Sequence, residues 1–193
     1  FLYLYYAENT GSVNLTQIAK ALSLSKATCT RAINDLSASG LISQTAEGTN
    51  KWITTAYTKS ELLEKAYGRL KTPIDRILYV KGTAQIEHPI ASGIRALARQ
   101  SMIGVNDQDG AIAIFKKEAA KIPAEDICTK QYFEDFGGAV IEVWSYDPII
   151  LERDGCVDDI SLLLSMDNDP NERVQTCLDE IRQKHGLPIK EEE

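Results

Sequence analysis

The sequence predicts an α+β protein with two domains of different character. Residues 14–42 repeat apolar positions at helical spacing, and residues 41–55 then carry two β-prone runs around a turn-like segment. Residues 1–72 hold 8 Lys and Arg against 5 Asp and Glu, a net charge of +3, whereas residues 73–193 hold 13 against 23, a net charge of −10. We therefore expect a helical domain with a β-hairpin over residues 1–72, followed by a smaller, acidic, mixed α/β domain within residues 73–193.

The first helix of the amino-terminal region is predicted to begin at Leu15. Asn14 occupies the N-cap position, and Gln17 can return a hydrogen bond to the backbone of Asn14. The apolar stripe of this helix consists of Leu15, Ile18, Ala19 and Leu22. A short turn follows, in which we expect Leu24 to be buried.

A second helix is predicted over residues 26–39, with Ser25 as its N-cap and Gly40 as the residue that ends it. Its inward face is predicted to comprise Cys29, Ala32, Ile33 and Leu36. Its outward face is small, polar and partly basic, and comprises Lys26, Thr28, Thr30, Arg31 and Asn34. Such side chains can bind base edges and phosphates, and an arginine can bind guanine through two hydrogen bonds. The face is a candidate for reading the major groove, and the alternative is an ordinary solvated helix face.

A β-hairpin is predicted directly after the second helix. Residues 41–45 and 51–55 are β-prone, and the intervening segment AEGTN is turn-like, with Gly48 suited to a positive φ. Two helices joined by a tight turn and followed by such a hairpin constitute a winged helix-turn-helix. The hairpin therefore favours the DNA-reading interpretation of the second helix over the solvated face.

The region resembles the MarR (multiple-antibiotic-resistance regulator) type of winged helix. The resemblance rests on Leu15-Thr16, on the serine-led helix from Ser25 to Leu36, and on Gly40-Leu41-Ile42. It covers about residues 1 to 70 and implies a bacterial, DNA-binding transcription regulator, with a repressor as the favoured type. The wing departs from the family pattern because it has no arginine, and Lys51 is the nearby cation. The predicted DNA-binding residues are thus Lys26, Thr28, Thr30, Arg31, Asn34 and Lys51.

The charge distribution predicts which partner each region binds. A slightly basic amino-terminal domain suits double-stranded DNA, and an acidic remainder suits a domain that does not contact DNA. An excess of only three positive charges predicts weak binding by one copy, because affinity grows with the number of phosphates neutralised. We therefore expect a homodimer that reads two half-sites.

A connecting helix is predicted after the wing. Thr58 and Glu61 have the spacing of a capping box, and an apolar face runs through Leu62, Leu63, Ala66, Tyr67 and Leu70. The helix could form a dimer seam or pack on the winged helix. We favour packing, because a seam of this length buries little area.

The acidic region predicts a mixed α/β fold. The predicted strands are residues 74–80, 111–115 and 139–146, and the predicted helices are 89–102, 158–165 and 171–185. For the last helix we expect Asp169 as the N-cap, Glu172 as its capping-box partner and Gly186 as the closing residue. This region is the candidate for sensing an effector, dimerising or meeting a protein partner.

Four residues of this region are candidates for a ligand or partner surface: Arg95, Arg99, Trp144 and Tyr146. Trp144 and Tyr146 lie two apart on a predicted strand and so share a face, and Arg95 and Arg99 are one helical turn apart. Paired arginines would suit an anionic ligand. The alternative, which we favour, places Trp144 in the core and the arginines in solvent.

The segments IEVWSYDPIIL, VDDISLLLSM and NERVQTCLDEI are also faintly similar to the antitoxin repressors of abortive-infection type IV toxin-antitoxin systems. The similarity implies an alternative function, in which the chain is an antitoxin-like regulator or an interaction module. Its acidic domain would then bind a partner protein.

No motif of the sequence indicates catalysis or a cofactor. The oxygen-rich segment from Asp167 to Glu172 lacks the glycine and the later glutamate of a calcium loop, and we interpret its acids as helix caps. The four cysteines are scattered and predict neither a zinc site nor a disulfide framework. No apolar run is long enough to cross a bilayer and no signal peptide opens the chain, so we expect a non-enzymatic cytoplasmic protein without a membrane partner. The opening FLYLYYAEN is typical of the end of a helix, and we expect further residues upstream.

Overall fold

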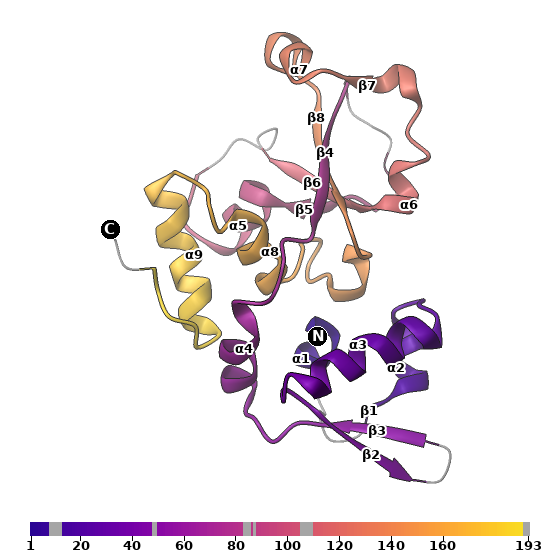
Figure 1. The fold of residues 1–193 in the computed structure, drawn as a ribbon. Coiled ribbons are helices and arrows are strands. Elements are labelled where there is room, and N and C mark those ends of the chain that lie inside the picture. Colours follow the sequence, from indigo (N-terminus) through magenta and orange to yellow (C-terminus); the bar gives the residue numbers. More distant parts are fainter. Residues whose placement is uncertain (8–12, 48–49, 83–85, 87, 105–109, 191–193) are drawn as a thin grey trace. The chain divides into compact units, whose positions relative to one another are not determined.

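The computed structural model describes residues 1–7, 13–47, 50–82, 86, 88–104 and 110–190. The chain divides into two compact units: unit 1 comprises Phe1–Leu70 with Gln183–Pro188, and unit 2 comprises Lys71–Arg182 with Ile189–Glu193. Unit 2 contains more residues than unit 1, so the expectation of a smaller second domain was wrong. Both units mix helices with strands, in agreement with the predicted α+β class (Figure 1).

Unit 1 is a helical domain with a small three-stranded sheet. Its elements are α1 (Leu2–Tyr6), β1 (Val13–Asn14), α2 (Leu15–Ala21), α3 (Lys26–Ala38), β2 (Ser43–Glu47), β3 (Asn50–Thr54) and α4 (Lys59–Tyr67). The sheet order is β1-β3-β2, with both pairs antiparallel. The helix-turn-helix and the two wing strands are thus present, and β1 is an addition that the sequence did not predict. Gly48, the predicted wing-turn glycine, lies outside the described residues.

The predicted helix caps of unit 1 are confirmed. The Asn14 side chain accepts from the Gln17 N–H and the Gln17 side chain from the Asn14 N–H, which completes a capping box. Ser25 Oγ accepts from the N–H of Thr28 at 3.1 Å. Gly40 has φ +74°, a conformation that a residue with a Cβ adopts only with strain.

The core of unit 1 confirms most of the predicted inward positions and corrects two. Cys29 and Ile33 of α3 are buried, but Ala32 is exposed, because at 100° per residue it lies roughly 80° from the midline between them. Leu24 was expected to be buried and is 46% exposed. Its N–H donates to the carbonyl of Ala19, so the turn is fixed through the backbone while the side chain faces solvent.

Helix α4 packs on the winged helix, as the sequence favoured. Leu62 and Ala66 belong to the same buried cluster as Ile53 of β3. Thr58 and Glu61 form the predicted capping box at its start. The returning segment Gln183–Pro188 completes unit 1, where His185 Nδ1 lies 2.7 Å from the Tyr5 hydroxyl.

Unit 2 is built on a five-stranded sheet of order β5-β6-β8-β4-β7. Its strands are β4 (Ile74–Val80), β5 (Ile90–Ser92), β6 (Ala111–Phe115), β7 (Ile127–Cys128) and β8 (Ala139–Trp144). Its helices are α5 (Gly93–Gln100), α6 (Lys116–Ala119), η1 (Ala124–Asp126), α7 (Lys130–Phe136), η2 (Pro148–Leu151), α8 (Asp159–Met166) and α9 (Glu172–Lys184). Strands β6 and β8 are parallel, and the other neighbours are antiparallel.

Two predictions for unit 2 need correction. The expected helix over residues 89–102 begins as β5, because Ile90–Ser92 pair with Ala111–Ala113 of β6, and only Gly93–Gln100 are helical. At the start of α9, Asn171 rather than Asp169 accepts from the helix, through the N–H of Arg173 at 3.0 Å. Asp169 instead accepts from the N–H of Asn171 and shapes the preceding turn.

Candidate nucleic-acid interface

The exposed face of α3 carries two polar side chains between two alanines. Arg31 and Asn34 are three residues apart and exposed, and Ala27 and Ala38 extend the same stripe by one turn on each side. The opposite face holds the helix in the core through Cys29 and Ile33. The alanines leave no bulk beside Arg31 and Asn34, so a helix of this shape can lie deep in a major groove.

The other predicted residues of α3 lie away from this stripe. Thr28 and Thr30 are half-buried. Because they are two residues apart on a helix, their side chains point about 160° apart around the helix axis. Thr28 Oγ1 is 2.9 Å from Ser25 Oγ, and Thr30 Oγ1 donates to the carbonyl of Lys26 at 2.8 Å. Both hydroxyls are therefore engaged within the helix. Lys26 is exposed at the amino end of α3, where a phosphate would be favoured.

Asn34 has a partner that the sequence analysis missed. Gln44 Nε2, on strand β2, donates to Asn34 Oδ1 at 3.2 Å. In this bond Asn34 Oδ1 is the acceptor, so its NH₂ group and a second lone pair of Oδ1 stay available for another partner. Ten residues separate the two side chains, and no local pattern marks such a pair, because it arises only when the wing packs beside α3.

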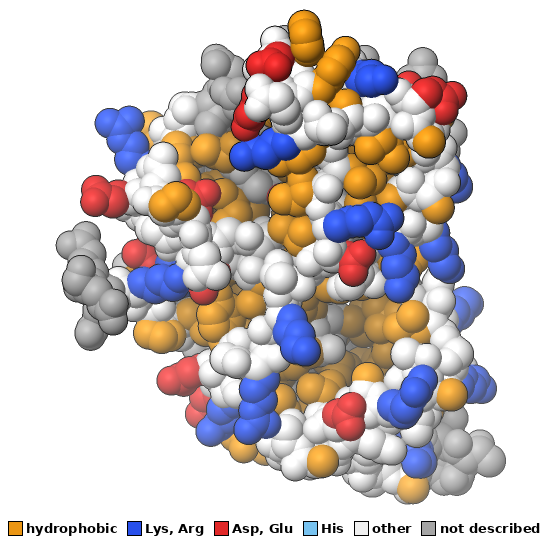
Figure 2. All heavy atoms as spheres, turned by 45° about the horizontal axis from the view of Figure 1, so that its top comes forward, with side chains coloured by type: hydrophobic (Ala, Val, Ile, Leu, Met, Phe, Trp, Pro, Cys, Tyr) orange, Lys and Arg blue, Asp and Glu red, His pale blue; other side chains and the backbone are white. Residues whose placement is uncertain are grey.

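The cations of unit 1 are dispersed. Lys51, on β3 opposite Ala46, is exposed, as are Lys26 and Arg31. Asp35, also exposed, lies beside Arg31 on α3 and would repel a nearby phosphate. Figure 2 likewise shows Lys and Arg side chains scattered over the face that it draws. This distribution predicts modest electrostatic affinity for each copy.

The second predicted surface, in unit 2, does not form as one site. Trp144 is fully buried and its Nε1 donates to Glu142 Oε2 at 3.0 Å, so it belongs to the core, as the favoured alternative held. Tyr146 is half-buried, and its hydroxyl lies 2.6 Å from Ser161 Oγ. Arg99 Nη1 donates to the carbonyl of Gly155 at 3.3 Å, while Arg95 is half-buried.

Burial shifts the acidity of two groups in this core. Desolvation raises the pKa of Glu142, against the opposing effect of the hydrogen bond from Trp144. Desolvation also raises the pKa of the Tyr146 phenol, an effect that the Ser161 bond opposes and the charge of Asp158 reinforces. Glu142 is buried beside Gly93 at the start of α5, and Tyr146 contacts Ser161 of α8, so these shifts indicate core packing.

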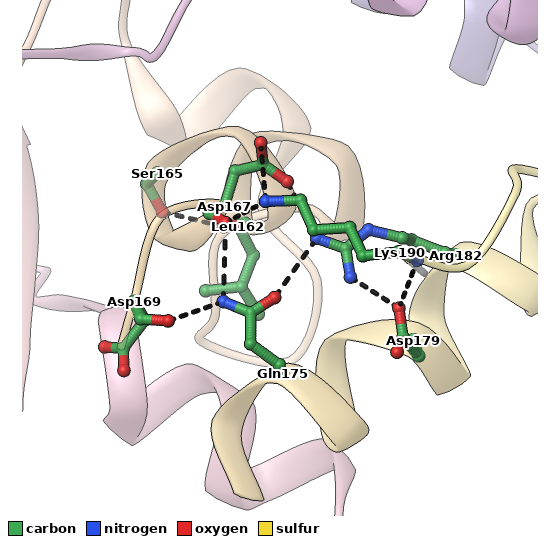
Figure 3. A network of polar contacts seen from close by, with 8 residues as sticks. All are labelled: Leu162, Ser165, Asp167, Asp169, Gln175, Asp179, Arg182 and Lys190. Carbon is green, nitrogen blue, oxygen red and sulfur yellow. Dashed lines mark hydrogen bonds and ion pairs between the residues drawn. The ribbon is translucent and has the colours of Figure 1, made fainter. Parts of the chain in front are cut away.

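The acid-rich segment after α8 is a structural ion network (Figure 3). Arg182, only 2% exposed, reaches Asp167 Oδ1 at 2.7 Å and Asp179 Oδ1 at 2.6 Å. Lys190 Nζ lies 3.2 Å from the other oxygen of Asp167, and Gln175 Nε2 donates to the carbonyl of Asp169 at 2.8 Å. Of the acids that could have suggested a metal site, Asp167 is thus held by two cations, and Asp169 accepts from the N–H of Asn171. Within the described ranges, no group of three or more His, Cys, Asp and Glu side chains is placed to bind a metal ion.

Comparison with known proteins identifies the amino-terminal part of the chain. Residues 1–51, from α1 to the start of β3, match the profile of the MarR family. No curated protein and no solved structure matched the chain. Among the described residues, no helix is both long and apolar enough to span a membrane. Residues 1–51 are therefore similar to the MarR family of DNA-binding transcription regulators, and they hold the helix-turn-helix and the first wing strand.

Proposed function

With the MarR-like winged helix as the premise, we propose that this protein is a dimeric, non-enzymatic repressor that reads DNA mainly through Arg31 and Asn34. The observation that carries the proposal is the exposed stripe of α3, in which these two side chains stand between Ala27 and Ala38. Two copies would place two α3 helices in successive major grooves, about 34 to 36 Å apart on one side of the duplex. Occupancy of such an operator would block transcription.

The two side chains favour different bases. Arg31 suits guanine, whose O6 and N7 accept two parallel hydrogen bonds. Asn34 suits adenine, because its NH₂ group can donate to N7 and the second lone pair of Oδ1, beside the one used by Gln44, can accept from N6. Lys26 and Lys51 would bind phosphates and fix the orientation of the domain. Each half-site should therefore contain a guanine and an adenine at a fixed spacing.

Selection of bound sequences from a random DNA pool, at two salt concentrations, tests this proposal. We expect a palindromic motif and a salt dependence that reports the number of phosphates neutralised. Arg31→Ala should weaken operator binding by about 1 to 3 kcal/mol, roughly 5- to 150-fold, because it removes a two-bond base contact. Arg69→Ala is the matched control, since Arg69 is exposed in unit 1 but lies beyond α4. An unchanged affinity for Arg31→Ala would exclude base reading by α3.

Unit 2 is the proposed regulatory part. Its net charge is strongly negative, so its role would be to sense a ligand or to hold the dimer rather than to contact DNA. A protein partner, as in an antitoxin-like regulator, is the alternative. It is favoured by α7, where Phe136 is 74% exposed and packs its ring 4.8 Å from that of Tyr132. A Phe136→Asp variant that binds DNA normally but loses a co-purifying protein would support the alternative.

A further inference from the structure

A cleft of about 830 Å³ runs along one face of the unit 2 sheet. Its floor is apolar and comes from the strands, with Val80 of β4, Ile90 of β5 and Ile114 of β6. Ile122, after α6, adds to one wall. Val80 and Ile114 also belong to the buried cluster of that sheet face, so the floor is fixed by core packing. A cleft of this size accommodates a small organic molecule.

The cleft has an aspartate at each end. The carbonyl of Asp126 accepts from the N–H of Lys81 at 2.8 Å, which places Asp126 beside the end of β4. Asp147 follows the opposite end of the sheet, three residues after β8. Val80 pairs with Ala139 at the start of β8, so the two aspartates are separated by about the length of that strand. Its six residues span roughly 17 to 20 Å.

The cations of the cleft are already engaged, whereas the terminal acids retain free oxygens. Lys121 Nζ lies 2.6 Å from Glu118 Oε2, and Lys81 Nζ donates to the carbonyl of Glu125 at 2.7 Å. Across the described parts of the chain, Asp126 makes no ion pair. Asp147 uses one oxygen, which accepts from the N–H of Ile149 at 3.1 Å. His88, exposed at the rim, is the remaining titratable group of the described lining.

We propose that this cleft binds a linear aliphatic polyamine. An ammonium group at each end would pair with Asp126 and Asp147, the methylene segments would cover the accessible side chains of Ile122 and Ile149, and the secondary ammonium groups would face the open side of the cleft. The described lining holds three carboxylates (Glu118, Asp126 and Asp147) against two lysines (Lys81 and Lys121), within a domain of negative net charge, so it favours a cation over an anion. Polyamine binding itself does not depend on DNA recognition, although its regulatory meaning rests on the sensing role proposed for unit 2.

Isothermal titration of the full chain with spermine, in the absence of DNA, tests the proposal. We expect one saturable site, and we expect Asp126→Asn and Asp147→Asn each to weaken binding by about tenfold or more through loss of a charge-assisted contact. Asparagine at position 147 can still accept from the N–H of Ile149, so the start of η2 is preserved. Asp135→Asn, on α7 outside the cleft, is the matched control and should change affinity by less than about twofold.

Two further results decide the outcome. Putrescine, a shorter diamine, should bind much more weakly, because it cannot reach both aspartates. Absence of saturable spermine binding, or an equal loss for Asp126→Asn and Asp135→Asn, would overturn the proposal, since equal losses indicate general attraction to an acidic surface. Neither result bears on the proposed DNA binding by α3, which the Arg31→Ala variant tests separately.

Discussion

The two units place their polar residues in opposite ways. In unit 1 the candidate functional side chains, Arg31 and Asn34, are exposed on a helix whose other face is core. In unit 2 the polar side chains of Arg182 and Glu142 are buried. Substitution of Arg31 or Asn34 should therefore change DNA binding with little loss of stability, whereas substitution of Arg182 or Glu142 should change the stability of unit 2. The two tryptophans allow a direct test, because Trp52 lies in unit 1 and Trp144 in unit 2.

The largest effect is expected for Arg182→Met. The variant leaves Asp167 and Asp179 close together without their buried guanidinium, which should lower the free energy of unfolding of unit 2 by about 3 to 5 kcal/mol. Trp144 fluorescence during urea unfolding, in a Trp52→Phe background, measures this loss. Arg173→Met, on the exposed side of α9, should cost less than about 0.5 kcal/mol. If Arg182→Met and Arg173→Met lowered the free energy of unfolding by similar amounts, the contrast between the units would be contradicted.

Glu142→Gln should stabilise unit 2 in a pH-dependent way. Burial raises the folded-state pKa of Glu142 above 4.5, so as pH rises the unfolded chain loses this proton first and ionisation favours unfolding. Glutamine keeps the acceptor for Trp144 and removes the ionisation. We expect a higher Tm than the parent at neutral pH and no difference below the unperturbed glutamate pKa of 4.5. A Tm difference that is constant across this range would exclude the desolvation effect.

Ser25→Ala tests the local character of unit 1. Loss of the bond from the Thr28 N–H should destabilise α3 by about 1 kcal/mol. Hydrogen exchange of the α3 amides would report this loss, and protection in α5 should remain unchanged. Ser25→Asp should restore protection, because aspartate also accepts at an N-cap.

Gln44→Met should have the smallest effect on affinity and a specific effect on sequence preference. Removing the donor to Asn34 Oδ1 frees the amide to rotate, which should reduce adenine discrimination by a few-fold, on the order of 0.5 to 1 kcal/mol. Competition binding with operators altered at that one position measures the change. In an Asn34→Ala background the same substitution should have no further effect, and Thr45→Ala provides the control on the same strand.

Local hydrogen bonds explain why unit 1 was the more predictable region. The caps at Asn14, Ser25 and Thr58 each join residues three apart, so the sequence alone indicates them. The strands that it missed, β1, β5 and β7, have only two or three residues each and exist because distant strands pair with them. Short pairings of this kind leave no periodic pattern.

The candidate sites show the same difference between features set by local spacing and features set by distant contacts. Arg31 and Asn34 were predicted from helical spacing and are exposed as expected, while Gln44 became visible only through packing. Trp144 was predicted correctly in both respects. A strand period of two placed it beside Tyr146 and Glu142, and the favoured alternative placed it in the core, where it is buried. Arg182 was missed because charged residues are rarely buried, and only its acidic partners make its burial favourable.

The hydrogen bond between Tyr5 and His185 can form only late in the synthesis of the chain. Its two residues are 180 positions apart, so a ribosome adding about 5 to 20 residues per second makes the tyrosine roughly 10 to 40 seconds before the histidine. During that interval α1 and α4 are present without the returning segment. Unit 1 needs Gln183–Pro188, which follow Lys71–Arg182 in the chain, so a nascent chain carries an unfinished unit 1 until most of unit 2 has been translated.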